Sequence, residues 1–176
     1  MYKWKDGFEP DMCDKDKQYR YILGKKGKNT LICIGANPSV AESSECDATM
    51  NLLCAILENN GYDGFIMLNL YPLIATNPDE LADFDEKIHA KNLAKIKAVL
   101  AEYKNSDILL CYGVVLKKRK YLQKCLDDIM ALCDGRKLKC LDAITKDGYP
   151  PHPSRKSKTI KIIDYKIKPT INSLQF

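Results

Sequence analysis

Histidine and long apolar runs are scarce in this 176-residue sequence. With only two histidines, His89 and His152, a histidine-rich metal site is excluded. No apolar stretch approaches the roughly 18 residues that a membrane-spanning helix needs. Residues 1–11 (MYKWKDGFEPD) have no apolar core of the signal-peptide kind. We therefore expect a cytoplasmic protein that makes no contact with a membrane.

Several motifs that bind metals or nucleotides are also absent. No two of the eight cysteines are spaced as C-x-x-C, which argues against a zinc ribbon. Without a secretory signal, we interpret them as small buried apolar residues rather than disulfide partners. The nucleotide-binding patterns G-x-x-x-x-G-K-[ST] and G-x-G-x-x-G are missing, as is the hydrolase elbow G-x-S-x-G. The sequence therefore predicts no metal and no cofactor.

The overall composition is that of an ordinary globular domain. Apolar residues make up 45% of the chain and charged residues 29%, and the length suits one domain. The 28 basic residues exceed the 23 acidic ones by a formal charge of +5. This balance permits a polyanionic partner but does not require one.

Apolar runs typical of buried parallel strands alternate with segments whose apolar residues recur at helical spacing. The expected strands are 31–35, 65–68, 108–112 and 138–141, and the expected helices are 47–59, 85–103 and 117–133. This alternation predicts a three-layer αβα fold around a central, mainly parallel four-stranded sheet.

Segments near both ends of the chain would add edge strands to this sheet. Residues 19–23 fit a short edge strand, and residues 159–167 have the β propensity to form a further one. We expect residues 1–18 to be an irregular lead-in and residues 19–176 to form a single α/β domain. The motif core of that domain is 31–154, and a basic tail follows at 155–176.

Candidate binding residues follow the expected strands at their carboxyl ends, where ligands bind in open α/β sheets. They are Gly35, Asn37, Pro38, Ser39, Asn69, Gly113, His152 and Ser154. An asparagine amide matches the N–H and C=O edge of a pyrimidine or purine lactam. A neutral histidine can donate to a carbonyl oxygen that gains negative charge. We therefore expect Asn37, Asn69 and His152 to converge on a flat heterocycle. Taken singly, each also fits a turn, a strand cap or a solvated loop.

Basic residues cluster in three places along the chain. The clusters are Lys25, Lys26 and Lys28; Lys117, Lys118, Arg119 and Lys120; and Arg155 with Lys156 in the tail. Together they could follow a phosphate backbone, and a solvated basic face is the alternative. Cations are unfavourable at a helix N-terminus, so the middle cluster favours an anionic partner.

Short motifs occur in a recognisable order between about residues 19 and 154. They are A-N-P-S-x-A at 36–41, D-A-T at 47–49, N-L-Y at 69–71, A-T-x-P at 75–78, N at 92, Y-G at 112–113 and H-P at 152–153. The set resembles a bacterial uncharacterised family, domain of unknown function sixteen forty-three. The resemblance implies that Tyr71, Thr76 and Asn92 are further substrate-binding candidates.

The sequence departs from that family at three motif positions. Ala48 replaces a proline, Ile74 an arginine and Tyr112 a tryptophan. The loss of the arginine removes any charge contact that the family makes at that place. The family name itself carries no activity.

A second resemblance, on shorter motifs, is to the uracil-DNA glycosylase superfamily. The motifs are G-A-N-P at 35–38, M-L-N at 67–69 and H-P-S at 152–154. The resemblance implies a uracil-DNA glycosylase-like fold in which Asn69 binds the base edge, His152 stabilises the leaving base and Asn37 holds the attacking water. The most active members carry aspartate where this chain has Asn37, which can orient water but cannot take its proton. Asp47 is the candidate for the missing carboxylate.

Three functional hypotheses remain open at this point. The first is an N-glycosylase-like hydrolase acting on a modified or deaminated base, in nucleic acid or as a free nucleotide. The second is a non-catalytic module that binds a nucleobase, a nucleotide or nucleic acid. The third is an unrelated hydrolase that uses His152 and Asp47.

Overall fold

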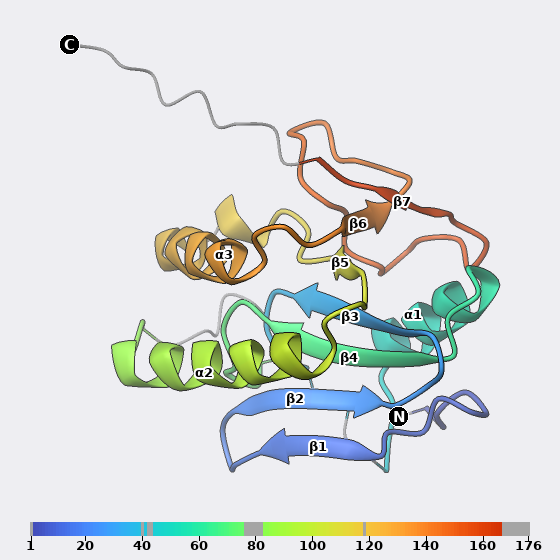
Figure 1. Cartoon of the computed structure of the whole chain (residues 1–176), viewed down its shortest axis with the longest axis horizontal. Coiled ribbons are helices and arrows are strands. Elements are labelled where there is room, and N and C mark those ends of the chain that lie inside the picture. The colour runs from blue at the N-terminus through green and yellow to red at the C-terminus, as the bar shows by residue number, and fades with distance from the viewer. Residues whose placement is uncertain (1, 40, 42–43, 76–82, 118, 167–176) are drawn as a thin grey trace.

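A computed structural model of the chain describes residues 2–39, 41, 44–75, 83–117 and 119–166. The described residues form a seven-stranded sheet with helices packed on both of its faces (Figure 1). The strands are β1 (Met12–Lys15), β2 (Arg20–Lys25), β3 (Thr30–Gly35), β4 (Gly64–Asn69), β5 (Ile108–Leu110), β6 (Leu138–Leu141) and β7 (Ile162–Asp164). The helices are α1 (Ala48–Asn59), α2 (Glu86–Glu102) and α3 (Lys120–Leu132), with a short 3-10 helix η2 (Val115–Lys117) before α3.

The sheet has the strand order β1-β2-β4-β3-β5-β6-β7. The four central strands β4, β3, β5 and β6 are parallel, whereas β1, β2 and β7 join by antiparallel pairing. The prediction of a mainly parallel four-stranded sheet is therefore wrong, because the sheet is mixed and has seven strands. The four predicted core strands form its centre, and the predicted strands near both termini are present as β2 and β7.

The N-terminal region also differs from the prediction. Residues 12–15 form β1 rather than part of an irregular lead-in, and β1 covers β2, which is thus not an edge strand. Trp4 and Phe8 are buried and stack on Phe65 of β4. The lead-in therefore belongs to the core, because its two aromatic rings cover the sheet.

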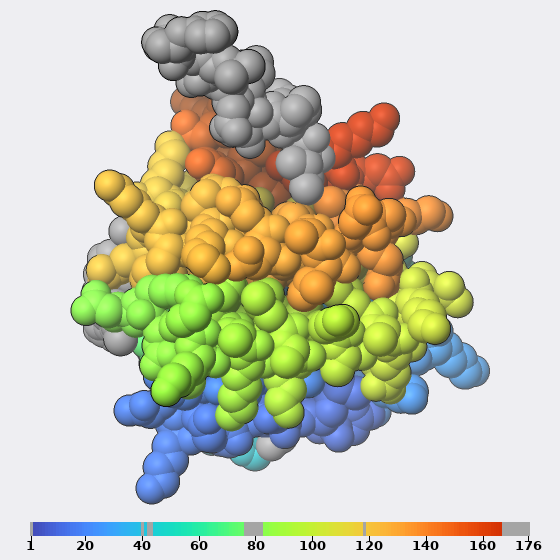
Figure 2. Space-filling view, turned by 60° about the vertical axis from the view of Figure 1, so that its left-hand side comes forward, coloured from blue at the N-terminus to red at the C-terminus, as the bar shows by residue number. Residues whose placement is uncertain are grey.

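Alternate residues of the strands pack against helices on opposite faces. Ile32 and Ile34 of β3 belong to the cluster that includes the apolar stripes of α2 and α3. Leu31 and Cys33 face the other way and belong to the cluster of α1. The result is three layers, with α1 on one face of the sheet. Figure 2 shows α2 and α3 lying side by side on the other face.

The first two helices begin at aspartate caps close to where the sequence places them. Asp47 accepts a hydrogen bond from the Met50 amide at 2.7 Å, and Asp85 accepts one from the Lys87 amide at 2.8 Å. The third helix begins at Lys120 rather than at Lys117, because residues 115–117 form the 3-10 turn.

The cysteines agree with the interpretation as buried apolar residues. All eight are free thiols, and only Cys13 is exposed. No helix in the described part of the chain is long and apolar enough to cross a membrane. The cytoplasmic location stays a prediction.

Candidate functional site

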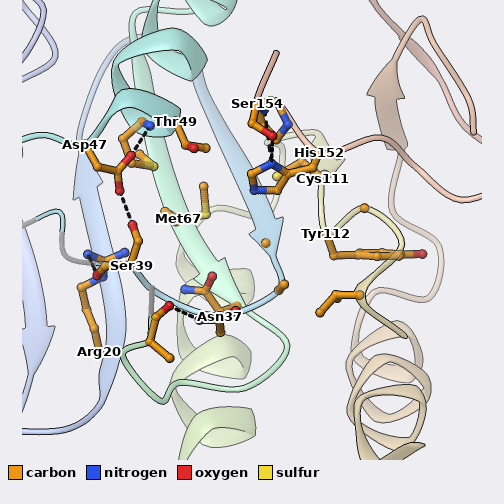
Figure 3. Close-up of a pocket in the computed structure, with 18 of the residues that line it drawn as sticks. Arg20, Asn37, Ser39, Asp47, Thr49, Met67, Cys111, Tyr112, His152 and Ser154 are labelled. Carbon is orange, nitrogen blue, oxygen red and sulfur yellow. Dashed lines mark hydrogen bonds between the residues drawn. The ribbon is translucent and has the colours of Figure 1, made fainter. Parts of the chain in front are cut away.

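A cavity of about 410 Å³ opens at the carboxyl ends of β3, β4 and β5 (Figure 3). Asn37, Asn69 and His152, which the sequence predicts to converge, all line it. The other predicted site residues in its wall are Gly35, Ser39, Asp47, Gly113 and Ser154. Side chains from distant parts of the chain thus lie together at the carboxyl ends of the strands, where open α/β sheets bind their ligands.

The cavity has two facing walls. Figure 3 shows Arg20, Ser39 and Asp47 on one side and His152 with Tyr112 on the other, with Met67 between them. The first wall comes from β2 and the segment that leads into α1. The second comes from the turn after β5 and from the loop that follows β6.

Asn37 offers an acceptor to the cavity rather than a donor. Its amide nitrogen donates to the carbonyl oxygens of Ala75 at 2.7 Å and Pro38 at 3.1 Å. The Ala75 amide returns a hydrogen bond to Pro38 at 3.0 Å, so the segments that follow β3 and β4 are joined. Both bonds use Nδ2, which leaves Oδ1 of Asn37 as the group that can accept from a ligand or a water.

Asn69 presents a buried donor that lacks a partner. The residue is 3% exposed, and its Nδ2 makes no hydrogen bond with any described residue. Gly35 on the adjacent strand leaves room for this amide, because a Cβ there would lie 2.9 Å from Asn69 Oδ1. Buried polar groups without partners are rare in folded proteins and costly to leave unpaired. An acceptor atom of a ligand in the cavity would satisfy Nδ2.

The hydrogen bonds of His152 determine its tautomer. Its Nδ1 accepts from the Ser154 amide at 3.2 Å and lies 2.8 Å from Ser154 Oγ. A backbone N–H can only donate, so Nδ1 carries no proton and the neutral ring carries its proton on Nε2. Figure 3 shows this second nitrogen turned toward the interior of the cavity. His152 can therefore donate a hydrogen bond to a ligand while neutral.

The surroundings of His152 also favour its neutral form. His152 is an exposed residue, yet the protein atoms packed against its ring desolvate it in part and lower the pKa of His152. The negative charge of Asp47 acts in the opposite direction and raises this pKa, but it is the smaller effect. The two groups thus interact across the cavity.

Gly113 allows His152 to approach the end of β5. Gly113 has a φ of +69°, and a Cβ on it would lie 3.0 Å from His152 Cβ. Its amide donates to the Pro150 carbonyl at 3.1 Å, which ties the turn after β5 to the loop that carries His152. A side chain at this position would strain the backbone and displace His152.

Asp47 joins the start of α1 to Ser39 within the first wall. One carboxylate oxygen accepts from the Met50 amide, and the other accepts from Ser39 Oγ. Arg20 is buried, and its Nη1 donates to the carbonyl oxygens of Ser39 and Ala41. Ser39 is thus held from both sides, which positions this wall of the cavity.

The remaining lining is largely apolar and contains several sulfur atoms. Met50, Met67 and Cys111 contribute to it, and all three side chains are buried. Burial raises the pKa of the Cys111 thiol to about 12, so the thiol stays protonated at neutral pH. These polarisable side chains are well suited to contact a flat aromatic ring.

Three predicted binding residues lie outside the cavity lining. Pro38 is buried and does not line the cavity. Tyr71 is 1% exposed, and its hydroxyl accepts a hydrogen bond from the Asp85 amide at 3.1 Å. Asn92 is fully buried in α2 and donates to the Asn69 carbonyl at 3.0 Å and the Leu70 carbonyl at 3.3 Å. Asn92 therefore supports the end of β4 rather than contacting a ligand. Thr76 lies outside the described residues.

The predicted nucleic-acid-binding residues do not line the cavity either. Lys117 pairs with Asp147 at 2.6 Å, and Arg119 is the N-cap residue of α3. Arg155 and Lys156 follow the His152 loop, and Arg155 adopts a left-handed φ of 61°. Lys118 lies outside the described residues. Within the described chain, the positive charge nearest the ligand space is that of Arg20.

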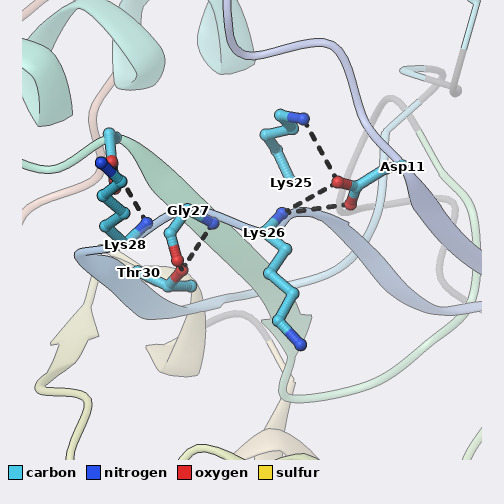
Figure 4. A network of polar contacts seen from close by, with 7 residues as sticks. Asp11, Lys25, Lys26, Gly27, Lys28 and Thr30 are labelled. Atoms are coloured by element: carbon cyan, nitrogen blue, oxygen red, sulfur yellow. Dashed lines mark hydrogen bonds and ion pairs between the residues drawn. The ribbon is translucent and has the colours of Figure 1, made fainter.

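The cluster of Lys25, Lys26 and Lys28 lies at the other end of the sheet, in the turn between β2 and β3 (Figure 4). Lys25 pairs with Asp11 at 3.2 Å, and the Lys26 amide donates to the same carboxylate. This cluster is separated from the cavity by the length of β3. Among the described residues it therefore forms no continuous basic surface with the carboxyl edge.

Some lining residues have no counterpart among the predicted site residues. Arg20, Thr49, Met50, Met67 and Cys111 are the main ones. Arg20 carried a signal, because it is a single charged residue between Tyr19 and Tyr21 in an expected strand. The sulfur-containing residues carried none, since their apolar character also fits a closed core.

The described residues hold no group of three or more histidine, cysteine, aspartate or glutamate side chains placed to bind a metal ion. The polar groups of the cavity are instead amides, one imidazole, hydroxyls, one carboxylate and the guanidinium of Arg20. Such a set is suited to hydrogen bonding with an organic ligand.

A model of the family described as "Protein of unknown function (DUF1643)" matches residues 20–154. The chain belongs to this family. The match includes all the predicted residues of the cavity, from Gly35 to Ser154, so the site lies within the family domain. No curated protein and no solved structure matches the chain. The link to the uracil-DNA glycosylase superfamily therefore stays a prediction.

Proposed function

We propose that the carboxyl-edge cavity binds the heterocycle of a nucleobase or nucleotide. The observation that carries the proposal is the unpaired Nδ2 of Asn69, a donor sealed in the wall of a cavity large enough for an organic ligand. A lactam carbonyl oxygen would supply the missing acceptor. A bound ligand would thus explain why this buried amide has no partner within the protein.

The other polar groups complete a pattern that a nucleobase edge can match. His152 adds a second donor through Nε2–H, and Asn37 adds an acceptor through Oδ1. Pyrimidine and purine lactams carry carbonyl oxygens beside ring N–H groups. The carbonyl oxygens would accept from Asn69 and His152, and a ring N–H would donate to Asn37. The sulfur-containing and apolar lining would contact the ring faces.

N-glycosidic hydrolysis is the second candidate function, and the neutral His152 together with Asp47 favours it. Water held by Asn37 would form a bond to the anomeric carbon while the N-glycosidic bond breaks. The base would leave with the bonding electron pair, and Nε2–H of His152 would stabilise the charge on its carbonyl oxygen. The proton that the water loses would pass to solvent, and the departing base would take up a proton from solvent. The Asp47 carboxylate would stabilise the positive charge that develops on the sugar.

The alternative is a module that binds the same ligand, or the corresponding base in nucleic acid, without cleaving it. Asn37 cannot take a proton from the attacking water, as a general base would. Binding therefore has stronger support than catalysis. One assay that follows both ligand binding and base release distinguishes a hydrolase from a binding module.

Calorimetric titration with nucleobases, nucleosides and nucleotides tests the binding proposal, and chromatography of the same mixtures detects released base. We expect Asn69→Leu, which keeps the volume but removes the amide, to weaken binding by about 10- to 100-fold. Asn105→Leu, in an exposed loop, is the matched control and should leave binding unchanged. Equal affinities for Asn69→Leu and the unaltered protein would contradict the proposal.

A further inference from the structure

We infer that the ligand of this cavity is an uncharged ribonucleoside whose sugar hydroxyls are bound by Asp47. This inference rests on the proposed function, because it assumes that the heterocycle lies against Asn69 and His152. It goes further by assigning the opposite wall to the sugar and by excluding a phosphate from the cavity.

The Asp47 carboxylate retains the capacity to accept hydrogen bonds from a ligand. An ionised carboxylate has about four lone-pair sites, and here the Met50 amide and Ser39 Oγ occupy one each. Sugar hydroxyls are donors that suit the remaining sites. A carboxylate at the ligand edge of an α/β sheet is also the group that binds a ribose hydroxyl in dinucleotide-binding folds. Thr49, which lines the cavity next to Asp47, adds a further hydroxyl.

The arrangement of the walls separates a polar heterocycle site from a sugar site. His152 and Asp47 lie on opposite sides of the cavity with Met67 between them (Figure 3). A nucleoside with its base against His152 and Asn69 would extend toward Asp47. The two ends of such a ligand thus meet groups of matching chemistry.

The described lining residues carry no net positive charge that would favour a phosphate, since Arg20 and Asp47 balance each other. Asp47 is negative, and the guanidinium of Arg20 is directed to the backbone carbonyls of Ser39 and Ala41. No lysine occurs among the described residues that line the cavity. A dianionic phosphate near Asp47 would lose its hydration and meet a like charge. A neutral nucleoside avoids this cost.

Titration of the full chain with four forms of each base tests the inference. The probes are the free base, the ribonucleoside, the 2′-deoxyribonucleoside and the ribonucleoside 5′-monophosphate of adenine, guanine, hypoxanthine, cytosine and uracil. For the base that binds best, we expect the ribonucleoside to bind at least about tenfold more tightly than each of the other three forms. This factor corresponds to one hydrogen bond to a charged group.

Asp47→Asn tests the assignment of the sugar site. Asparagine still caps a helix, so the fold should survive. We expect this variant to bind the ribonucleoside and the 2′-deoxyribonucleoside with affinities within about twofold of each other, while its affinity for the free base is unchanged. Asp85→Asn is the matched control, because Asp85 caps α2 in the same way and does not line the cavity. The control should keep the preference for ribose.

The possible results separate this inference from the proposed function. If the free base binds as tightly as the ribonucleoside, the sugar site is wrong and the heterocycle site stands. If the 5′-monophosphate binds most tightly, or if Asp47→Asn keeps the ribose preference, the inference is overturned. If no probe binds, both the inference and the proposed function are wrong.

Discussion

At the scale of single residues, the neighbours of His152 decide what its ring can do. The Ser154 amide requires a bare Nδ1, and the protein atoms around the ring lower its pKa. Protonation would place a second proton on Nδ1, facing a backbone donor. The ring is therefore adapted to act as a neutral donor at physiological pH.

This arrangement predicts a pH dependence of stability. The folded protein holds the His152 proton less tightly than the unfolded chain, whose histidine has a pKa near 6.5. The free energy of unfolding should therefore rise with pH from the lowered folded pKa up to about 6.5. Below that window the contribution of His152 to stability should be absent. Urea denaturation at a series of pH values measures it. His152→Gln should reduce this slope, and an NMR titration midpoint for His152 above 6.5 would contradict the argument.

A second prediction concerns the contact between Gly113 and His152. Gly113→Ala should lower the free energy of unfolding by about 1 kcal/mol for its left-handed backbone, and should also weaken ligand binding by displacing His152. Gly135→Ala is the control, because Gly135 has a similar φ of +72° and no atom within 4 Å of an added Cβ. We expect the control to lose stability, measured by urea denaturation, but to keep its affinity. Equal affinity in both variants would show that His152 does not depend on this contact.

The candidate site was predictable where it depends on strand ends. Asn37, Asn69 and His152 each follow an apolar run that forms a parallel strand, so topology alone brings them to one edge. Arg20 had only its place between two tyrosines as a signal, because its side chain binds the backbone carbonyls of Ser39 and Ala41, which no local pattern indicates. Met67 and Cys111 look like core residues in the sequence, and only the three-dimensional position of the cavity shows their second role.

At the scale of elements, capping and buried polar contacts decide where the secondary structure ends. The first two helices were predictable to within a residue at either end, because aspartates mark their starts. The third helix was predicted too long, since residues 115–117 form a 3-10 turn and α3 begins only at Lys120, after its N-cap residue Arg119. The pairing of β7 with β6 was beyond the reach of local patterns, because these strands are distant in the sequence. The strand β1 was missed because its four residues mix polar and apolar types.

Asn92 gives a prediction about the link between α2 and β4. Asn92→Ala removes two hydrogen bonds to the carbonyls that follow β4, and should lower the free energy of unfolding by about 2 kcal/mol. Urea denaturation measures this loss. The exposed Asn105→Ala should change stability by less than about 0.5 kcal/mol. If Asn92→Ala were as stable as the control, Asn92 would not support the end of the strand.

At the scale of the whole molecule, the positive charges are divided between the two ends of the sheet. The cluster of Lys25, Lys26 and Lys28 lies before β3, and the cavity lies after it. The six residues of β3 span about 17 Å, which exceeds the Debye length of about 8 Å at physiological salt. The lysines of this cluster are thus screened from a ligand in the cavity.

The triple variant Lys25→Gln, Lys26→Gln and Lys28→Gln tests this separation. We expect its affinity for the best ligand in the titration panel to change by less than about twofold, because screening removes its long-range influence. Calorimetric titration at two salt concentrations provides the measurement. A tenfold weaker affinity would show that this cluster belongs to the binding surface.

The position of β4 between β2 and β3 has a consequence for biosynthesis. The strands β2 and β3 are consecutive in the chain, yet they are not neighbours, and β4 fills the space between them. A nascent chain on the ribosome must therefore hold β2 and β3 apart until β4 emerges. The loop with His152 emerges later still, so the cavity is complete only after nearly the whole domain has been synthesised.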